Sequence, residues 1–326
     1  MRLPKLTYHE PKTLKELLRL KGDLQDSCAV LAGGTDLIPM LKRRNSTSAH
    51  VVNIKRVPEF NRLTTDEEGL RIGPAVTLRD LIEHPRISKE YALLAEAAES
   101  VGFNQLRNMA TLGGNVCLDT KCTYFNQSAF WWQSRPDCYK RGGDTCYVVK
   151  GGKGCHALSA ADTVSALIAL EAEVVVQGPN RERRILVEDF FTGDGRSPHR
   201  VEADEVVTAV RVPPGGEGWR EGFMKKSVRG SVDFALVSLS IRLKMNGKGV
   251  GDARIALNGV SSRPVRAKAA EKYVTGKEIC EGTVTSAAQV LLKEIQPLSL
   301  IGCSPFLRRN ILRALFEDSI AAVTIS

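Results

Sequence analysis

The sequence lacks any apolar run approaching the roughly 18 residues that a membrane-spanning helix needs. It also lacks internal repeats and low-complexity tracts. The first residues, MRLPKLTYHEPKTLKELLRL, are basic but contain no continuous apolar segment, so we expect no secretory signal there. These absences predict a cytoplasmic protein that has no membrane partner.

Aromatic residues and histidines are scarce, at 6% of the chain and five residues respectively. The sequence contains no Ser-His-Asp arrangement that would indicate a hydrolytic triad. It also contains no His-rich motif that would indicate a mononuclear catalytic metal site. The net charge of +9 is dispersed along the chain. A basic excess is compatible with binding to nucleic acid, to a membrane surface or to an acidic protein, and equally with an ordinary solvated surface. Because no recognised nucleic-acid-binding module is present, we expect no nucleic-acid partner.

Hydrophobic periodicity predicts an α+β protein whose first two segments are α/β units. Residues 1–57 read as a small unit, with a helix that ends at Gly22 and, over residues 28–34, a buried strand that leads into a turn. Residues 58–216 read as a second unit, which includes a helix opened by Thr77.

The last segment, residues 217–326, predicts a C-terminal α+β domain. Its first half alternates polar and apolar residues with a period of two, which predicts strands with one buried face. Three helices follow, and Ser304 and Pro305 open the last of them.

Two glycine pairs interrupt the α/β segments, one in VLAGGTDL (30–37) and one in RNMATLGGNV (107–116). The first stands between a strand and a helix, where backbone N–H groups and the Thr35 hydroxyl could contact a phosphate. It matches neither G-x-G-x-x-G nor a Walker loop, and each pair alone could be an ordinary tight turn. Together, two such loops could hold a pyrophosphate from opposite sides.

Five of the eight cysteines lie in residues 117–155, a glycine-rich basic stretch that also carries adjacent tryptophans. From Cys122 the spacing is C-x15-C-x7-C-x8-C, and Cys117 precedes it. Structural zinc usually takes close cysteine pairs, whereas a [4Fe–4S] cluster needs four thiolates around a larger object that long loops can wrap. A cluster, zinc and cysteines that bind no metal are the alternatives at this point, whereas a disulfide framework is not expected in the cytosol. The tryptophans and Phe130 could shield the cluster or simply pack the loop.

Four segments, in this order, resemble the FAD-binding medium subunits of the molybdenum hydroxylase (xanthine dehydrogenase) family. They are LAGGTDLIPMLK, QLRNMATLGGNV, SAADTVSALIALEAEVVV and VDFALVSLSIRL. The resemblance covers essentially the whole chain. It implies two α/β FAD-binding subdomains of the vanillyl-alcohol-oxidase-like (PCMH) kind, at 1–57 and 58–216. A C-terminal domain of antiparallel sheet plus helices would follow at 217–326.

The resemblance further implies non-covalent FAD, with its pyrophosphate and ribityl chain wrapped by the two glycine loops. The implied contacts are Val30, Leu31, Ala32, Gly33, Gly34, Thr35, Asp36, Leu37, Thr111, Gly114 and Asn115. Asp162 matches an acidic position near the cofactor, with a helix N-cap as its alternative role. Lys225 matches a basic position near the flavin, although the adjacent Lys226 could fill it and a solvated strand residue is also possible.

In the family, the GGN and AAD segments ordinarily lie within a few residues of each other, so residues 117–156 are identified as an insertion. It is similar to the insertion of the 4-hydroxybenzoyl-CoA reductase branch, which carries an additional [4Fe–4S] cluster. The implied ligands are Cys122, Cys138, Cys146 and Cys155. Cys117 would be a spare, and His156 would pack nearby or serve as an alternative ligand. We expect Cys28, Cys280 and Cys303 to be core residues or inert thiols.

These resemblances imply an electron-transfer subunit that has no catalytic residues of its own. Its partners would be a large molybdopterin subunit and a small subunit with two [2Fe–2S] clusters, in a dimer of heterotrimers. Reduced ferredoxin would supply the electrons, and the complex would convert 4-hydroxybenzoyl-CoA to benzoyl-CoA. The alternatives are a cluster-containing FAD subunit of another molybdenum hydroxylase and, remotely, a cysteine-rich nucleic-acid-binding protein.

The cysteine stretch also carries six basic against three acidic residues between Cys117 and Cys155. Such an excess could steer an acidic ferredoxin toward the cluster, with Lys140 and Arg141 as the residues to test. The alternative is that these charges only keep a surface loop soluble.

Overall fold

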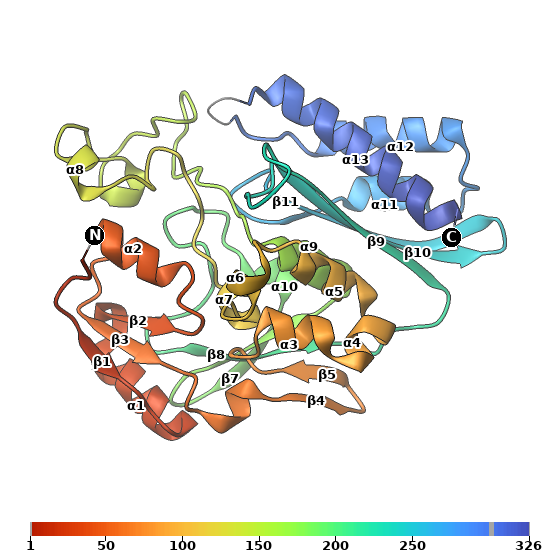
Figure 1. The fold of residues 1–326 in the computed structure, drawn as a ribbon. Helices are drawn as coiled ribbons and strands as arrows, with labels where there is room; N and C mark the ends of the chain where they lie inside the picture. Colours follow the sequence, from red (N-terminus) through yellow and green to blue (C-terminus); the bar gives the residue numbers. More distant parts are fainter. Residues whose placement is uncertain (1, 300–302, 326) are drawn as a thin grey trace.

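The computed structural model describes residues 2–299 and 303–325, which form three β-sheets with associated helices (Figure 1). The predicted α+β class is confirmed. The sheets lie within residues 7–53, 63–212 and 219–266. The division into domains at 57/58 and 216/217 remains a prediction. None of the described helices is long and apolar enough to cross a membrane.

The first sheet is parallel, with strand order β1-β3-β2. Thr13 caps the first helix by accepting a hydrogen bond from the Glu16 amide. The expected stop at Gly22 is wrong: the backbone stays helical there and leaves the helix at Gln25, whose φ is 45°. The elements are β1 (Thr7–His9), α1 (Leu14–Leu24), β2 (Cys28–Leu31), α2 (Leu37–Arg43) and β3 (His50–Asn53).

The second sheet is antiparallel, with strand order β4-β5-β8-β6-β7. Thr77 accepts from the Asp80 amide at 3.0 Å, so the predicted helix start is confirmed. The strands are β4 (Leu63–Asp66), β5 (Gly69–Ile72), β6 (Glu173–Gln177), β7 (Glu182–Leu186) and β8 (Val206–Val212). The helices are α3 (Leu78–Glu83), α4 (Pro85–Glu90), α5 (Ala92–Glu99), α6 (Asn104–Arg107), α7 (Leu112–Val116), α9 (Asp162–Ala169) and α10 (Val187–Phe190).

The third sheet is antiparallel, with strand order β12-β11-β10-β9. Of the three helices in this part of the chain, the first and the last contact the strands, and the middle one packs chiefly on the other two. Ser304 Oγ accepts from the Leu307 amide, which confirms the predicted start of the last helix. The elements are β9 (Trp219–Lys226), β10 (Val237–Asn246), β11 (Gly249–Asn258), β12 (Val265–Arg266), α11 (Lys268–Val274), α12 (Glu281–Glu294) and α13 (Pro305–Ile325).

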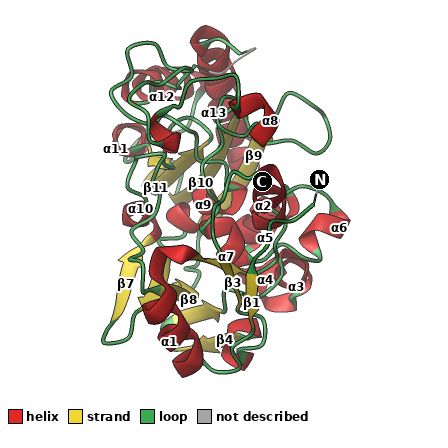
Figure 2. Ribbon diagram, turned by 90° about the vertical axis from the view of Figure 1, so that its left-hand side faces the viewer, coloured by secondary structure: helices red, strands yellow, loops and turns green. Residues whose placement is uncertain are grey.

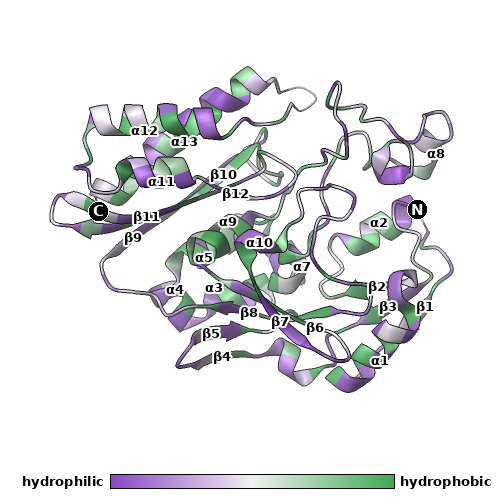
Figure 3. Cartoon of the chain, turned by 180° about the vertical axis from the view of Figure 1, so that it is seen from behind, coloured by the Kyte–Doolittle hydropathy of each residue, from purple (hydrophilic) through white to green (hydrophobic). Residues whose placement is uncertain are grey.

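The prediction of a single buried face fails for β10, whose first seven residues are all buried. Helix α9 contacts this strand from one side and α13 from the other, so both faces are covered (Figure 1). Figure 3 shows that α9 is mainly hydrophobic, and all eight of its residues are buried. From the side, α11–α13 lie at one end of the molecule and α1 at the other (Figure 2).

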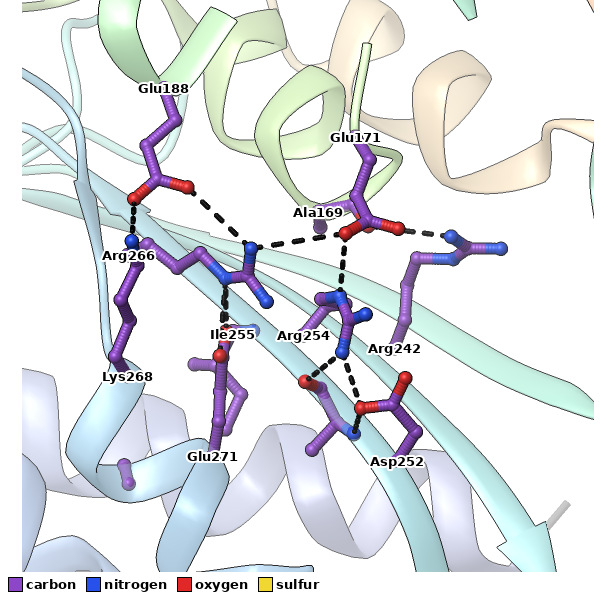
Figure 4. Close-up of polar contacts among 12 residues, drawn as sticks. Ala169, Glu171, Glu188, Arg242, Asp252, Arg254, Ile255, Arg266, Lys268 and Glu271 are labelled. Atoms are coloured by element: carbon purple, nitrogen blue, oxygen red, sulfur yellow. Dashed lines mark hydrogen bonds and ion pairs between the residues drawn. The ribbon is translucent and has the colours of Figure 1, made fainter. Parts of the chain in front are cut away.

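Ion pairs join the third sheet to helical segments that pack beside the second sheet (Figure 4). Arg254 Nε lies 3.1 Å from a carboxylate oxygen of Glu171, a residue with a φ of 55° that follows α9. Arg266 lies between Glu188 and Glu271, with nearest N–O distances of 3.5 and 2.8 Å. These contacts hold the third sheet against the loop after α9 and against α10.

The cysteine stretch leaves the body of the protein after α7 and returns before α9, and it lies near α2 (Figure 1). It contains the short helix α8 (Ala129–Trp132) and the 3-10 turn Tyr139–Arg141. Its own small core consists of Phe125, Trp132 and Cys138, with Cys122, Tyr124 and Trp131 packed around them. We refer to residues 117–156 as the cysteine loop.

Candidate functional site

A cavity of about 610 Å³ lies where the two glycine loops meet. Residues from all three segments of the chain line it, so it forms only when these segments pack together. Of the predicted FAD contacts, the lining includes Val30, Ala32, Gly33, Gly34, Thr35, Asp36, Leu37, Thr111, Gly114, Asn115 and Asp162. Leu31 and Lys225 do not line it.

The first glycine loop presents unpaired backbone amides to this cavity. Among the described residues, the N–H groups of Ala32, Gly33, Gly34 and Thr35 have no protein acceptor. Gly34 has a φ of +72°, which an L side chain rarely adopts. The strand before the loop is less buried than predicted, because Val30 faces the cavity and is 39% exposed.

Gly33 is required for a different reason, because the first loop rests directly on the second. A Cβ at this position would lie 2.1 Å from the carbonyl oxygen of Met109. In the second loop, Thr111 Oγ1 accepts from the Gly114 amide at 3.1 Å. The Asn115 side chain accepts from the Thr163 hydroxyl at 2.6 Å, which ties this loop to α9.

Asp162 and Lys225 form a buried ion pair beside the cavity, with 2.5 Å between Oδ2 and Nζ. The other carboxylate oxygen, Oδ1, is buried and has no partner among the described atoms. Burial raises the pKa of Asp162 to about 6, and Lys225 opposes this shift. The N-cap interpretation is wrong, because Ala161 holds that position. The solvated interpretation of Lys225 is also wrong, whereas Lys226 is exposed.

His199 also lines the cavity, and the sequence reasoning missed it. Its ring stacks on Phe190 with 5.3 Å between ring centroids, and its Nε2 is buried without a partner. Burial lowers the pKa of His199 to about 4, so the imidazole is neutral at physiological pH. It lies on an irregular segment after α10, where no sequence pattern marks it.

These groups fit FAD. Unpaired amides and the Thr35 hydroxyl suit an anionic pyrophosphate, since such donors commonly bind phosphate oxygens. The volume of the cavity is within the range typical of small-molecule and cofactor sites. The unpaired Asp162 oxygen and the neutral His199 are polar groups that a bound flavin could satisfy.

The cysteine loop encloses a second cavity, of about 20 Å³. Cys122, Cys138, Cys146 and Cys155 all line it, together with His156, whose Nε2 is buried without a partner. All eight cysteines of the chain are free. Cys117 lies elsewhere, on the wall of the large cavity, where burial raises the pKa of its thiol to about 12.

The second cavity combines four cysteine thiols with little free space. Among residues 2–299 and 303–325, no three His, Cys, Asp or Glu side chains meet closely enough to share a single ion. A [4Fe–4S] cluster is larger, and its four thiolates lie correspondingly farther apart. The four thiols match a cluster in donor type, whereas the described residues show no group placed to hold a metal ion.

The aromatic side chains of the loop have mixed roles. Trp132 is buried against Cys138, and its ring packs edge-on to Trp131. Phe130 is 83% exposed, so the expectation that it shields the cysteines is wrong. Among the remaining thiols, Cys28 and Cys303 are buried as expected, whereas Cys280 is exposed.

Several basic residues of the loop are structural. The Lys140 side chain is 6% exposed and pairs with Asp119 at 2.6 Å. Arg141 pairs with Asp137 and lies over the ring of Trp132. Lys140 and Arg141 are therefore unsuitable for testing a docking surface, and the exposed basic side chains Lys150 and Lys153 are better suited.

Comparison with known proteins matches nearly the whole chain. The family described as FAD binding domain in molybdopterin dehydrogenase matches residues 4–215. The CO dehydrogenase flavoprotein C-terminal domain matches residues 222–323.

Two curated relatives illustrate the sequence similarity. The carbon monoxide dehydrogenase medium chain of Hydrogenophaga pseudoflava is 28% identical over 296 residues, covering 90% of this chain and 88% of that one. The aldehyde oxidoreductase FAD-binding subunit PaoB of Escherichia coli is 32% identical over 260 residues, covering 75% and 78%.

A solved structure shows the same fold. It is the carbon monoxide dehydrogenase of Hydrogenophaga pseudoflava that lacks the Mo-pyranopterin moiety of its cofactor, with a TM-score of 0.83 and 26% identity. The match covers 100% of this chain and 99% of that one.

Proposed function

Because the chain belongs to the FAD-binding medium subunits of the molybdenum hydroxylase family, we propose that its large cavity holds one non-covalent FAD. The oxidoreductase complex formed with its partner subunits carries out the substrate chemistry, and this chain transfers electrons. A flavin exchanges one or two electrons, which suits a link between one-electron carriers and a two-electron reaction.

In this proposal, the amides of the first glycine loop and the Thr35 hydroxyl hold the pyrophosphate. Asp162 presents its unpaired oxygen to the flavin side of the cavity, and Lys225 keeps that carboxylate oriented and charged. His199 supplies a neutral imidazole.

We further propose that Cys122, Cys138, Cys146 and Cys155 ligate one [4Fe–4S] cluster. The supporting observation is that these four thiols, spread over 34 residues of sequence, line one cavity. Cys117, which was set aside as a spare, is on a different wall. A cluster exchanges single electrons, so the cysteine loop would receive electrons for the flavin.

The insertion favours the 4-hydroxybenzoyl-CoA reductase branch of the family. In that assignment the chain is a cytoplasmic subunit of a dimer of heterotrimers, with a large molybdopterin subunit and a small subunit that carries two [2Fe–2S] clusters. Ferredoxin supplies two electrons, which together with two protons convert 4-hydroxybenzoyl-CoA to benzoyl-CoA and water. The second candidate is a cluster-containing subunit of another molybdenum hydroxylase, since relatives act on carbon monoxide and on aldehydes.

The single observation that carries the proposal is the pair of cavities, one lined by unpaired amides and one by four cysteines. Anaerobically purified protein should contain one FAD and about four iron and four sulfide per chain. Stoichiometric zinc without iron would refute the cluster. Benzoyl-CoA formation by the purified complex then separates the two substrate assignments.

A further inference from the structure

An ion pair between a buried lysine and a partly exposed aspartate connects the two cavities. Asp119 lines the large cavity, and Lys140 lines the cysteine cavity. The distance between Asp119 Oδ1 and Lys140 Nζ is 2.6 Å. The positive end of this pair therefore faces the four cysteines, and its negative end faces the proposed flavin.

Lys140 is held from several directions at once. Its ammonium also donates to the Thr120 hydroxyl and to the Gly195 carbonyl, each at 2.7 Å. It lies 5.1 Å from the centre of the Phe125 ring, a member of the loop's small core. A lysine with all these partners is fixed in place, unlike an ordinary surface lysine.

Gly195 connects this network to one proposed ligand. Its amide donates to the Cys155 carbonyl at 3.0 Å, and a Cβ on Gly195 would lie 2.8 Å from Cys155 Sγ. The chain at Gly195 thus lies directly between Lys140 and Cys155. The same segment leads to His199 in the large cavity.

The Lys140 side chain is 6% exposed and that of Asp119 is 27% exposed, so water screens these charges less than at an open surface. Their reach is visible at His199, whose pKa is lowered mainly by burial. Asp119 opposes this shift and Lys140 adds to it. Asp119 and His199 both line the large cavity.

We propose that Lys140 and Asp119 are positioning residues that hold the cysteine loop against the flavin cavity and set the relative reduction potentials of the two cofactors. This inference rests on the proposed function. A fixed positive charge stabilises the more negative, reduced form of a nearby cluster, whereas a fixed negative charge disfavours reduction of a nearby flavin. The pair therefore makes the cluster easier to reduce relative to the flavin.

The test is a spectroscopic redox titration of the complex carrying Lys140→Met, with Lys150→Met as the matched control because Lys150 is exposed on the same loop. Lys140→Met should move the cluster midpoint to a more negative value, and Lys140→Arg should restore much of the shift. The cluster midpoint of Lys150→Met should equal that of wild type. Equal cluster midpoints in wild type and Lys140→Met would overturn the proposal, as would an equal shift in Lys150→Met.

Asp119→Asn provides a readout that does not require the cluster. It should move the flavin midpoint to a more positive value, and this is measurable in protein that holds flavin without iron. Iron-free wild-type protein would refute the cluster, while the flavin midpoint of Asp119→Asn still tests the pair. If Lys140→Met alone loses iron and Lys140→Arg retains it, the positioning role is supported. An unchanged flavin midpoint in Asp119→Asn would refute the electrostatic role.

Discussion

Lys225 and Asp162 lie 63 residues apart in the sequence and meet as a buried ion pair, with 2.5 Å between Nζ and Oδ2. Lys225 comes from β9 of the third sheet, and Asp162 is the first residue of α9 in the FAD-binding part. Lys225 also donates to the Ser100 carbonyl at 3.0 Å. One lysine thus joins the C-terminal sheet to two elements beside the flavin cavity.

Lys225→Met should destabilise the protein by about 3–5 kcal/mol near neutral pH, because it leaves a buried carboxylate without its partner. Flavin content should fall as well, since Asp162 would lose its orientation. The matched control is Lys226→Met, because Lys226 is adjacent but exposed. Chemical denaturation and flavin-to-protein ratios measure both effects, and equal losses in the two variants would contradict the assignment to Lys225.

The pH dependence of stability follows from the same carboxyl group. Asp162 has a pKa raised from 3.8 to about 6 in the folded protein. The folded state therefore holds a proton there that the unfolded state has lost, and stability falls as pH rises through this window. The contribution is about 3 kcal/mol between pH 4 and 6. Asp162→Asn should remove this decrease in the free energy of unfolding. Chemical denaturation at a series of pH values measures it, and a decrease that persists in Asp162→Asn would contradict the assignment to Asp162.

Gly33→Ala should lower flavin content strongly. A Cβ there would collide with the Met109 carbonyl oxygen and separate the two glycine loops. Iron content should change little, because the cysteine loop has its own core. Gly282→Ala is the control, since a Cβ at Gly282 has nothing within 4 Å. Simultaneous loss of flavin and iron would indicate general unfolding rather than a local effect.

The cysteines provide a prediction at single-residue level. Serine substitution of Cys122, Cys138, Cys146 or Cys155 should each remove or convert the cluster, because each thiol lines the same cavity. Cys117→Ser should retain it, since Cys117 lies on the wall of the other cavity. Iron analysis and low-temperature EPR compare the five variants. Loss of the cluster only in Cys117→Ser would show that the ligand assignment is wrong.

Features set by local chemistry could be predicted from the sequence, as the caps at Thr77 and Ser304 show. Features set by distant packing could not. Both faces of β10 are covered because α9, from the middle of the sequence, and α13, from its C-terminal part, pack on it. Lys140 resembles any solvated lysine until Asp119 and Gly195 are brought to it by the fold.

The candidate site shows the same division. The glycine loops and Asp162 stand in recognisable patterns, and the structure brings them to one cavity. His199 and Asp119 lie in irregular segments, and only tertiary packing places them there. The wide spacing of four cysteines suggests a shared site. That Cys117 lies outside this site is visible only once the loop is folded.

Whether ferredoxin docks on the cysteine loop can be tested by changing the exposed charges of that loop. Lys150 and Lys153 are exposed on the segment between Cys146 and Cys155. Ferredoxins are commonly acidic, so these lysines could accelerate association by long-range attraction. Replacing both by Glu should slow reduction by ferredoxin roughly tenfold at low salt, and the difference should shrink as ionic strength rises.

Two controls separate docking from damage in that experiment. Lys89→Glu with Lys248→Glu makes the same charge change at exposed positions on α4 and on the β10–β11 turn, far from α8 (Figure 1). This control should have a much smaller effect on ferredoxin, because screening limits the range of surface charges. A small neutral dye should reduce all variants at the same rate, since it has no net charge to be steered. Equal slowing with both donors would indicate a damaged cluster, and an unchanged ferredoxin rate would show that these lysines do not form the docking surface.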